Sequence, residues 1–280
     1  MSIKPVSAIA TVLMLGAAAI GCATTPPPAA QAETTSQRTV DPSKPTVVLV
    51  HGAFADSSSW NGVVSRLQQR GYPVIAPANQ LRGVETDAAS VKSVLKSVTG
   101  PIVLVGHSYG GVVISQAAKD EPSVKALVYI AAFIPEAGES AVDLATKYPG
   151  AKFSPATLRS VKYTMADGKE GSDTYIRTEA FRDVFAADVP QDTVALMAAT
   201  QRPVEIAALN TKFTGTPAWK SVPSWALVAS GDNAIPAASE RFMAERAKAH
   251  IVEINASHAV SVSQPEAVAN IIDEAGRSVK

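Results

Sequence analysis

Residues 102–113 read Ile-Val-Leu-Val-Gly-His-Ser-Tyr-Gly-Gly-Val-Val, an apolar run that leads through a glycine-rich turn into a second apolar stretch. The run at 102–105 predicts a buried strand, and the pattern at 109–119 predicts a helix. The motif Gly-x-Ser-x-Gly between a strand and a helix is typical of a nucleophile elbow, a sharp turn that exposes a serine hydroxyl. We therefore predict that Ser108 is a nucleophile. The alternative is a glycine-rich connection with a buried serine.

On both sides of this turn, short apolar runs alternate with helical patterns. We expect strands at residues 46–51, 72–76, 102–105, 126–131, 225–229 and 251–254. We expect helices at residues 60–70, 86–98, 109–119, 237–249 and 265–279. Six strands joined by helical crossovers predict an α/β fold with a doubly wound, mainly parallel sheet.

One segment, residues 135–223, breaks the alternation and is rich in aromatic residues. It lies between the fourth and fifth expected strands, so it should cover the carboxyl ends of the strands, where α/β sheets bind ligands. We predict a helical cap; the alternative is a structural excursion on the rim.

A serine nucleophile needs a base within hydrogen-bond reach. His258 follows the last strand and precedes the last helix, which places it at the same sheet edge as Ser108. His107 should point away from the serine, His51 should be structural, and His250 begins a strand at the opposite edge. We therefore predict that His258 is the general base; the alternative is a solvated loop histidine.

The imidazole in turn needs an acid that fixes its tautomer and stabilises its cation. Asp232 follows the fifth strand at the same sheet edge, and we predict that it orients His258. Glu136 and Glu139, after the fourth strand, are competing acids. Asp232 could also be a simple turn residue, because Gly-Asp-Asn is good turn chemistry.

Acyl transfer also requires backbone N–H groups that face the developing oxyanion. We expect these from Tyr109, the residue after the nucleophile, and from Ala53, in the loop after the first strand. Phe54, Phe133 and Trp219 are expected to line the substrate pocket.

The composition of the 280 residues narrows the class of protein. A hydrophobic fraction of 46% with 18% charged residues excludes an intrinsically disordered chain. Lys and Arg number 25 and so do Asp and Glu, so no basic excess favours nucleic-acid binding. The single cysteine, Cys22, excludes an intramolecular disulfide and a cysteine-rich zinc site.

The N-terminal sequence resembles an export signal. Lys4 precedes an uncharged apolar run at residues 8–20, typical of a signal peptide, here expected over residues 1–21. The run ends at Cys22 in a sequence similar to a bacterial lipobox, which predicts lipidation of that cysteine. Residues 22–45 should form a flexible linker before a domain at 46–280. The expected location is periplasmic, soluble or held on the membrane only by the lipid anchor; the alternative is a soluble secreted protein.

From residue 47 onward the chain resembles the α/β-hydrolase superfamily, and within it the small group of arylesterases, plant methyl esterases and hydroxynitrile lyases. The resemblance is carried by Val48-Leu-Val-His-Gly-Ala53, Val105-Gly-His-Ser-Tyr-Gly-Gly111, Gly231-Asp-Asn-Ala-Ile-Pro236 and Ser257-His-Ala-Val260. Hydroxynitrile lyases carry a lysine where Ala259 stands and a threonine where Ala53 stands, so the resemblance argues against cyanohydrin cleavage. Dehalogenases and epoxide hydrolases of this fold carry Asp where Ser108 stands.

The sequence thus predicts a serine esterase that needs no metal or organic cofactor and acts on a small apolar or aromatic ester. Two alternatives stay open: a ligand-binding protein that kept the pocket without catalysis, and a lyase or perhydrolase that uses the same three residues. The sequence leaves the oligomeric state open.

Overall fold

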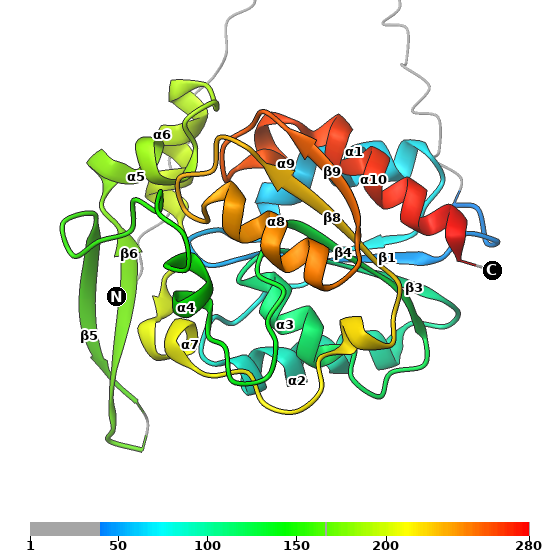
Figure 1. The fold of residues 1–280 in the computed structure, drawn as a ribbon, viewed down its shortest axis with the longest axis horizontal. Helices are drawn as coiled ribbons and strands as arrows, with labels where there is room; N and C mark the ends of the chain where they lie inside the picture. Colours follow the sequence, from blue (N-terminus) through cyan, green and yellow to red (C-terminus); the bar gives the residue numbers. More distant parts are fainter. Residues whose placement is uncertain (1–39, 166, 280) are drawn as a thin grey trace, which may run out of the picture. The chain divides into compact units, whose positions relative to one another are not determined.

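The computed structural model describes residues 40–165 and 167–279. Its central element is a six-stranded sheet with the strand order β2-β1-β3-β4-β8-β9, in which every neighbouring pair is parallel (Figure 1). The strands are β1 Thr46–Val50, β2 Val74–Ile75, β3 Ile102–Ser108, β4 Val124–Ala132, β8 Ser224–Ala229 and β9 His250–Ile254. The predicted parallel, doubly wound sheet is therefore confirmed.

Helices cover both faces of this sheet because the side chains of a strand alternate between the faces. In β1, Val47 and Leu49 belong to a buried cluster that includes residues of α1 and α10, whereas Val48 and Val50 belong to a second cluster that includes residues of α2, α3 and α8. The helices of the sheet domain are α1 Asn61–Gln69, α2 Val84–Ser97, α3 Gly110–Ala117, α8 Ala237–Arg246, α9 Val260–Ser263 and α10 Pro265–Ser278, and a short 3-10 helix, η1, spans Ser57–Trp60.

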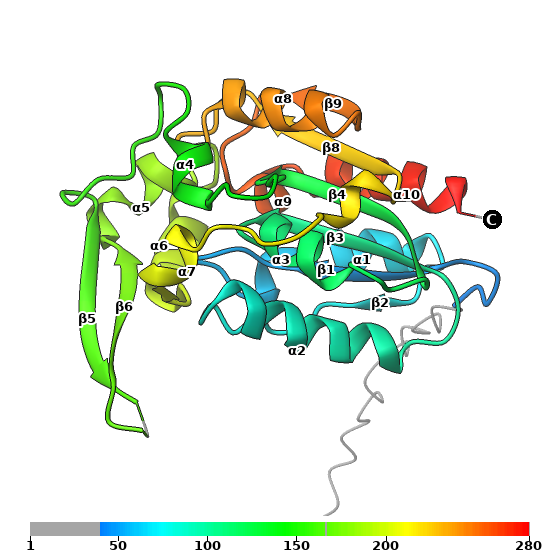
Figure 2. The same cartoon turned by 60° about the horizontal axis from the view of Figure 1, so that its bottom comes forward.

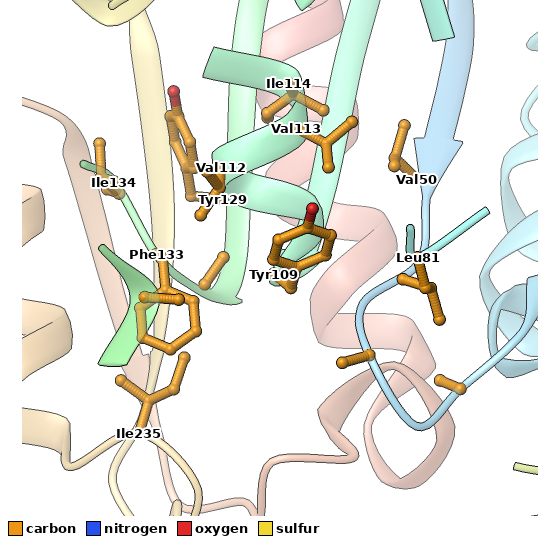
Figure 3. Close-up of a cluster of buried hydrophobic side chains, with 14 of the residues drawn as sticks. Val50, Leu81, Tyr109, Val112, Val113, Ile114, Tyr129, Phe133, Ile134 and Ile235 are labelled. Atoms are coloured by element: carbon orange, nitrogen blue, oxygen red, sulfur yellow. The ribbon is translucent and has the colours of Figure 1, made fainter. Parts of the chain in front are cut away.

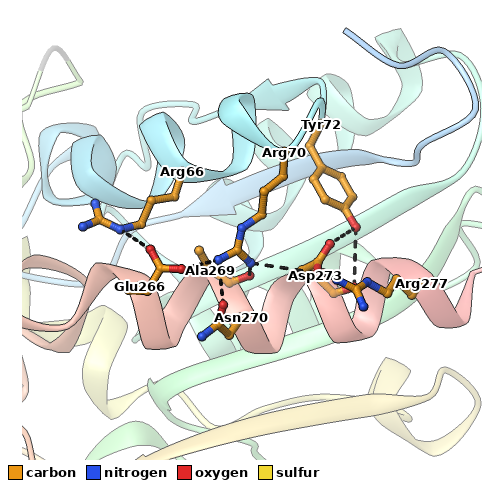
Figure 4. Close-up of polar contacts among 8 residues, drawn as sticks. All are labelled: Arg66, Arg70, Tyr72, Glu266, Ala269, Asn270, Asp273 and Arg277. Atoms are coloured by element: carbon orange, nitrogen blue, oxygen red, sulfur yellow. Dashed lines mark hydrogen bonds and ion pairs between the residues drawn. The ribbon is translucent and has the colours of Figure 1, made fainter.

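Helices α1 and α10 are joined by a polar network on the outside of the sheet (Figure 4). Arg66 Nε donates to Glu266 over 2.7 Å, and Arg70 donates to Glu266 and to Asn270. Next to these, Tyr72 Oη donates to Asp273 Oδ1 over 2.7 Å. This network fixes α10, the helix that follows the loop of the predicted base.

The insertion after the fourth strand has the expected place but a mixed structure. It contains α4 Ala141–Ala145, β5 Leu158–Thr164, β6 Glu170–Ile176, α5 Thr178–Phe185, α6 Gln191–Thr200, β7 Val204–Glu205, α7 Ile206–Asn210 and a 3-10 helix, η2, Ala218–Lys220. The expected helices are present, but β5, β6 and β7 form an antiparallel sheet that was not predicted. Figures 1 and 2 show α4, α5, α6, α7, β5 and β6 gathered at one end of the central sheet, whereas η2 lies next to α3. We call residues 135–223 the cap.

The predicted signal peptide at 1–21, the lipidation site Cys22 and most of the predicted linker at 22–45 lie outside the described residues. Among residues 40–165 and 167–279, no helix is long and apolar enough to span a membrane.

Candidate active site

The turn between β3 and α3 has the backbone of a nucleophile elbow. Ser108, the last residue of β3, has a φ of 53°, in the left-handed region that non-glycine residues seldom occupy. Such a conformation costs roughly 1–3 kcal/mol and clusters at functional sites. The turn also requires Gly111, because a Cβ there would lie 2.2 Å from the carbonyl oxygen of Phe133.

The Ser108 hydroxyl faces a cavity rather than a partner. Ser108 is 7% exposed and lines the cavity described below. Its Oγ makes no hydrogen bond to any described residue. The hydroxyl is therefore free to meet a ligand.

His258 and Asp232, the predicted base and the predicted acid, are in direct contact. His258 Nδ1 lies 2.5 Å from Asp232 Oδ2, and the His258 residue is only 1% exposed. Asp232 Oδ1 accepts hydrogen bonds from the backbone N–H groups of Ala234, over 2.6 Å, and Ile235, over 2.8 Å. The carboxylate is thus held in place, and the proton that it accepts from Nδ1 leaves His258 Nε2 as the basic nitrogen.

His107 links the serine to this pair, a role that the sequence analysis missed. Its Nε2 lies 2.9 Å from the backbone carbonyl of His258, so Nε2 carries the proton and donates it. Its ring centroid lies 4.7 Å from that of His258. Burial, and then the nearby His258, lower the pKa of His107 well below its usual value, so the ring is neutral. No hydrogen bond joins Ser108 Oγ directly to His258 within residues 40–165 and 167–279.

The cap holds the His258 loop from the other side. The Phe185 ring packs edge-on against the His258 ring at 4.8 Å, and the Phe185 carbonyl accepts from Ala259 N over 2.9 Å. Ser257 Oγ donates a hydrogen bond to Asp188. The loop of the predicted base is therefore packed between the sheet domain and the cap.

His51 has the structural role that the sequence analysis expects. The backbone N–H of Asn79 donates to His51 Nε2 over 2.9 Å, so the ring proton is on Nδ1, which lies 2.9 Å from the carbonyl of Gly52. Burial lowers the pKa of His51, which keeps the ring neutral. The side chain of Asn79 donates in turn to the His51 carbonyl. Asn79 therefore holds the start of the loop after β1 through both the ring and the backbone of His51.

The loop that carries Ala53 lies directly against the serine. A Cβ on Gly52 would be 2.6 Å from Ser108 Cβ, so only glycine allows this approach. On the other side, Tyr109 precedes α3, whose first N–H groups have no partner within the helix. The predicted oxyanion donors Ala53 and Tyr109 thus lie on the two backbone segments that meet at Ser108.

The side chain of Tyr109 is part of the hydrophobic core, and its hydroxyl is bound to Asp87 rather than to a residue of the candidate site. It lies among buried apolar side chains that include Val50, Leu81 and Val113 (Figure 3). Its hydroxyl donates to Asp87 Oδ2 over 2.9 Å, and burial raises its pKa, so the phenol stays protonated. This contact anchors Tyr109, whose backbone N–H is one of the two predicted oxyanion donors.

A cavity of about 160 Å³ opens beside Ser108 between the sheet domain and the cap. A cavity of about 150 Å³ can hold benzene, so the volume suits a small acyl or aromatic group. The lining is almost entirely apolar: Ala53, Phe54, Ser108, Tyr109, Phe133, Ala141, Val142, Ala145, Thr146, Ala151, Phe153, Leu158, Ile206, Leu209 and Ile235.

Of the three expected pocket residues, Phe54 and Phe133 line this cavity and Trp219 does not. The Trp219 indole instead donates its Nε1–H to the Pro135 carbonyl over 2.8 Å, and its ring lies beside the Arg246 guanidinium. Its expected place in the pocket is wrong because this part-buried N–H takes a backbone partner at the start of the cap. The competing acid Glu139 is paired with Arg246, and Glu136 with Lys220, so neither is a partner of His258.

No group of three or more His, Cys, Asp or Glu side chains able to hold a metal ion occurs in the part of the chain that the structure describes. The polar groups gathered at the candidate site are the side chains of Ser108, His258 and Asp232 and nearby backbone N–H groups.

Comparison with known proteins places this fold in a family. The model of the "Alpha/beta hydrolase family" matches residues 47–271. The chain belongs to the α/β-hydrolase family. Among its relatives is the pyrethroid hydrolase of Sphingobium wenxiniae (strain DSM 21828 / CGMCC 1.7748 / JZ-1), 27% identical over 253 residues that cover 81% of this chain and 85% of the relative. Another is the putative methylesterase 11, chloroplastic, of Arabidopsis thaliana, 26% identical over 249 residues that cover 82% of this chain and 63% of the relative.

Solved structures of α/β hydrolases resemble the described fold. A pyrethroid hydrolase from Sphingobium faniae JZ-2 superposes with a TM-score of 0.68 at 25% identity, covering 84% of this chain and 98% of that one. Polyneuridine aldehyde esterase superposes with a TM-score of 0.71 at 19% identity, covering 82% of this chain and 98% of that one. The likeness at 19% identity supports the fold alone.

Proposed function

We propose that this α/β hydrolase is a serine esterase that cleaves small carboxylic esters through an acyl-enzyme intermediate. The observation that carries the proposal is the hydrogen bond between His258 Nδ1 and Asp232 beside a strained serine whose hydroxyl faces an apolar cavity. Binding of a ligand alone would not require a strained serine together with an oriented imidazole.

In the proposed reaction Ser108 Oγ attacks the ester carbonyl while His258 Nε2 takes the hydroxyl proton. The negative charge that forms on the carbonyl oxygen is stabilised by the N–H groups of Ala53 and Tyr109, each worth about 10²–10³ in rate in comparable sites. His258 then gives its proton to the leaving alcohol. A water molecule, deprotonated by the same nitrogen, attacks the acyl-enzyme and releases the acid, and Asp232 stabilises the imidazolium in both halves.

The cavity supports a small apolar or aromatic substrate. Its apolar lining and its volume of about 160 Å³ disfavour charged or bulky acyl groups. The relatives named as a pyrethroid hydrolase and a methylesterase agree with an ester as the reactant.

The first test compares the mature protein with its Ser108→Ala variant on p-nitrophenyl acetate and p-nitrophenyl butyrate. Ser108→Ala should reduce kcat by about 10⁴ or more, whereas Ser97→Ala, on the exposed side of α2, should leave it unchanged. Full activity in Ser108→Ala would contradict the proposal. Ester binding without turnover by the unaltered protein would favour a binding protein, and product formed without uptake of water would favour a lyase.

We also infer that the protein is exported and lipidated at Cys22, from the sequence of residues 1–22. Mass spectrometry of the mature N-terminus should find a diacylglyceryl group on this cysteine. An unmodified N-terminus downstream of Cys22 would contradict lipidation.

A further inference from the structure

A buried carboxyl group that the proposed reaction does not use lies behind the predicted acid. Glu240, in the first turn of α8, is only 3% exposed. One of its oxygens, Oε2, accepts a hydrogen bond from the backbone N–H of Ala229, at the end of β8, over 3.0 Å. Asp232 follows Ala229 by three residues, so both acids are held at the end of the same strand.

No cation among the described residues pairs with the Glu240 carboxyl. Arg241, its neighbour on α8, directs its guanidinium to Glu253 over 2.7 and 2.8 Å. The Arg241 guanidinium also interacts with Glu240 through space without forming an ion pair, whereas the charges of Asp232 and Glu253 are both negative and oppose the ionisation of Glu240. An ionised Glu240 would therefore be a buried anion facing two others, which is strongly unfavourable.

The free oxygen of Glu240 indicates which of the two acids holds the proton. Glu240 Oε1 is fully buried and has no donor partner in the described chain, which suits an O–H group that donates rather than an oxygen that accepts. The carboxylate of Asp232 is a neighbouring acceptor for such an O–H group. Asp232, in contrast, receives two backbone N–H groups and the imidazole of His258, all of which stabilise its charged form.

We propose that Glu240 is a positioning residue that stays protonated and donates an O–H···O hydrogen bond to Asp232, fixing the carboxylate that orients His258. The inference rests on the proposed function for its catalytic consequence but not for the protonation itself. Burial, and then the charge of Asp232, raise the pKa of Glu240, in agreement with this state. The donated bond takes up part of the negative charge of the Asp232 carboxylate that faces His258.

Two substitutions separate this role from a structural one. Glu240→Gln keeps an acceptor for Ala229 and a donor for Asp232, whereas Glu240→Met keeps the volume and loses both. Glu245→Gln, on the exposed side of the same helix, is the matched control. The full mature protein is used in every case, and its folding is followed by thermal unfolding.

The first measurement is the infrared difference spectrum between the unaltered protein and Glu240→Gln at neutral pH, with Glu245→Gln alongside. We expect Glu240→Gln to remove the C=O band of a protonated carboxylic acid and Glu245→Gln to remove a carboxylate band. Loss of a carboxylate band in Glu240→Gln would overturn the proposal, whether or not the protein is an esterase.

The second measurement is the pH dependence of kcat/KM on p-nitrophenyl acetate. Glu240→Gln should keep the acid limb of the unaltered protein. Glu240→Met should lower kcat by roughly tenfold, the cost of a lost hydrogen bond to a charged group, and move the acid limb to higher pH. If the acid limb moves to lower pH in Glu240→Gln, Glu240 is ionised in the unaltered protein. If the acid limb does not move in Glu240→Met, Glu240 has only a structural role. Either result overturns the proposal. Inactivity of the unaltered protein, with the carboxylic-acid band present, would refute the esterase and leave the protonated Glu240 intact.

Discussion

His107 Nε2 donates a hydrogen bond to the backbone carbonyl of His258, 2.9 Å away, across 151 positions of the chain. The residue before the serine therefore holds the loop of the predicted base. The two residues of the proposed proton transfer are positioned by one buried, neutral imidazole, which no motif identifies as functional.

Replacement of His107 should weaken catalysis without loss of the fold. In His107→Phe the carbonyl of His258 loses its donor, which costs about 1–3 kcal/mol when the group stays buried, and the base can shift. A displacement of about 1 Å can lower the rate about 10²-fold. We expect a lower kcat with little change in KM, measured on p-nitrophenyl acetate. An unchanged kcat would show that the hydrogen bond does not position His258.

The contact between Gly52 and Ser108 should tolerate no side chain. In Gly52→Ala the new Cβ would lie 2.6 Å from Ser108 Cβ and 2.8 Å from the His107 carbonyl oxygen, so the loop must move. This moves the Ala53 N–H away from the oxyanion, and loss of one such donor costs about 10²–10³ in kcat. Circular dichroism and kcat measured together test this. A folded Gly52→Ala protein with full activity would exclude the loop from the oxyanion site.

Asp232→Asn should abolish most of the activity while keeping the geometry. The amide can present its N–H to His258 Nδ1, which then holds the imidazole in the wrong tautomer, and in a comparable triad this costs about 10⁴ in kcat. Stopped-flow kinetics with p-nitrophenyl acetate measures the loss. A reduction of less than tenfold would point to another acid as the partner of His258.

Filling the cavity should change the choice of acyl group. Leu209→Trp adds a large side chain to the lining, so kcat/KM should fall for p-nitrophenyl butyrate more than for the acetate. Trp219→Phe is the control, because Trp219 lies outside the lining. If both variants alter the ratio of the two rates equally, the cavity does not bind the acyl group.

The protonated Glu240 should make the unaltered protein lose stability as the pH rises. The pKa of Glu240 is raised in the folded state, mainly by burial, whereas an unfolded glutamate ionises near pH ~4.3. Folding above that pH therefore takes up a proton, and the free energy of unfolding falls by about 1.4 kcal/mol per pH unit until the folded group ionises. Glu240→Gln has no group that ionises at this position. The difference in free energy of unfolding between Glu240→Gln and the unaltered protein should therefore shift in favour of the variant from pH 4 to pH 7. Urea titrations at several pH values measure it; an advantage that is constant with pH would contradict a raised pKa.

The sheet could be predicted because each buried strand carries its own signal. Val47–Val50 and Ile102–Val105 are continuous β-branched and apolar runs, and strands covered on both faces have that composition. The placement of the three candidate residues could be predicted from the order of strands and helices, since Ser108 ends β3 and Asp232 and His258 follow β8 and β9, whose carboxyl ends lie at one edge of a parallel sheet.

The cap could not be predicted in detail because its strands lack this signal. The strand β5 carries Arg159, Ser160 and Lys162 on an almost fully exposed ribbon, so no apolar alternation marks it. The links made by His107 and Glu240 were also hidden, because a buried polar residue in a sequence gives no sign of its partner. Trp219 was misplaced because an aromatic residue in the cap can pack against the backbone as readily as against a ligand.

The most direct test of Ser108 as the nucleophile is the intact mass and peptide map of the protein after reaction with a fluorophosphonate ester. We expect one covalent adduct per chain, located on Ser108, absent in Ser108→Ala and formed much more slowly in His258→Ala. Absence of the adduct in the folded, unaltered protein, or its persistence in Ser108→Ala, would contradict the assignment of Ser108 as the nucleophile.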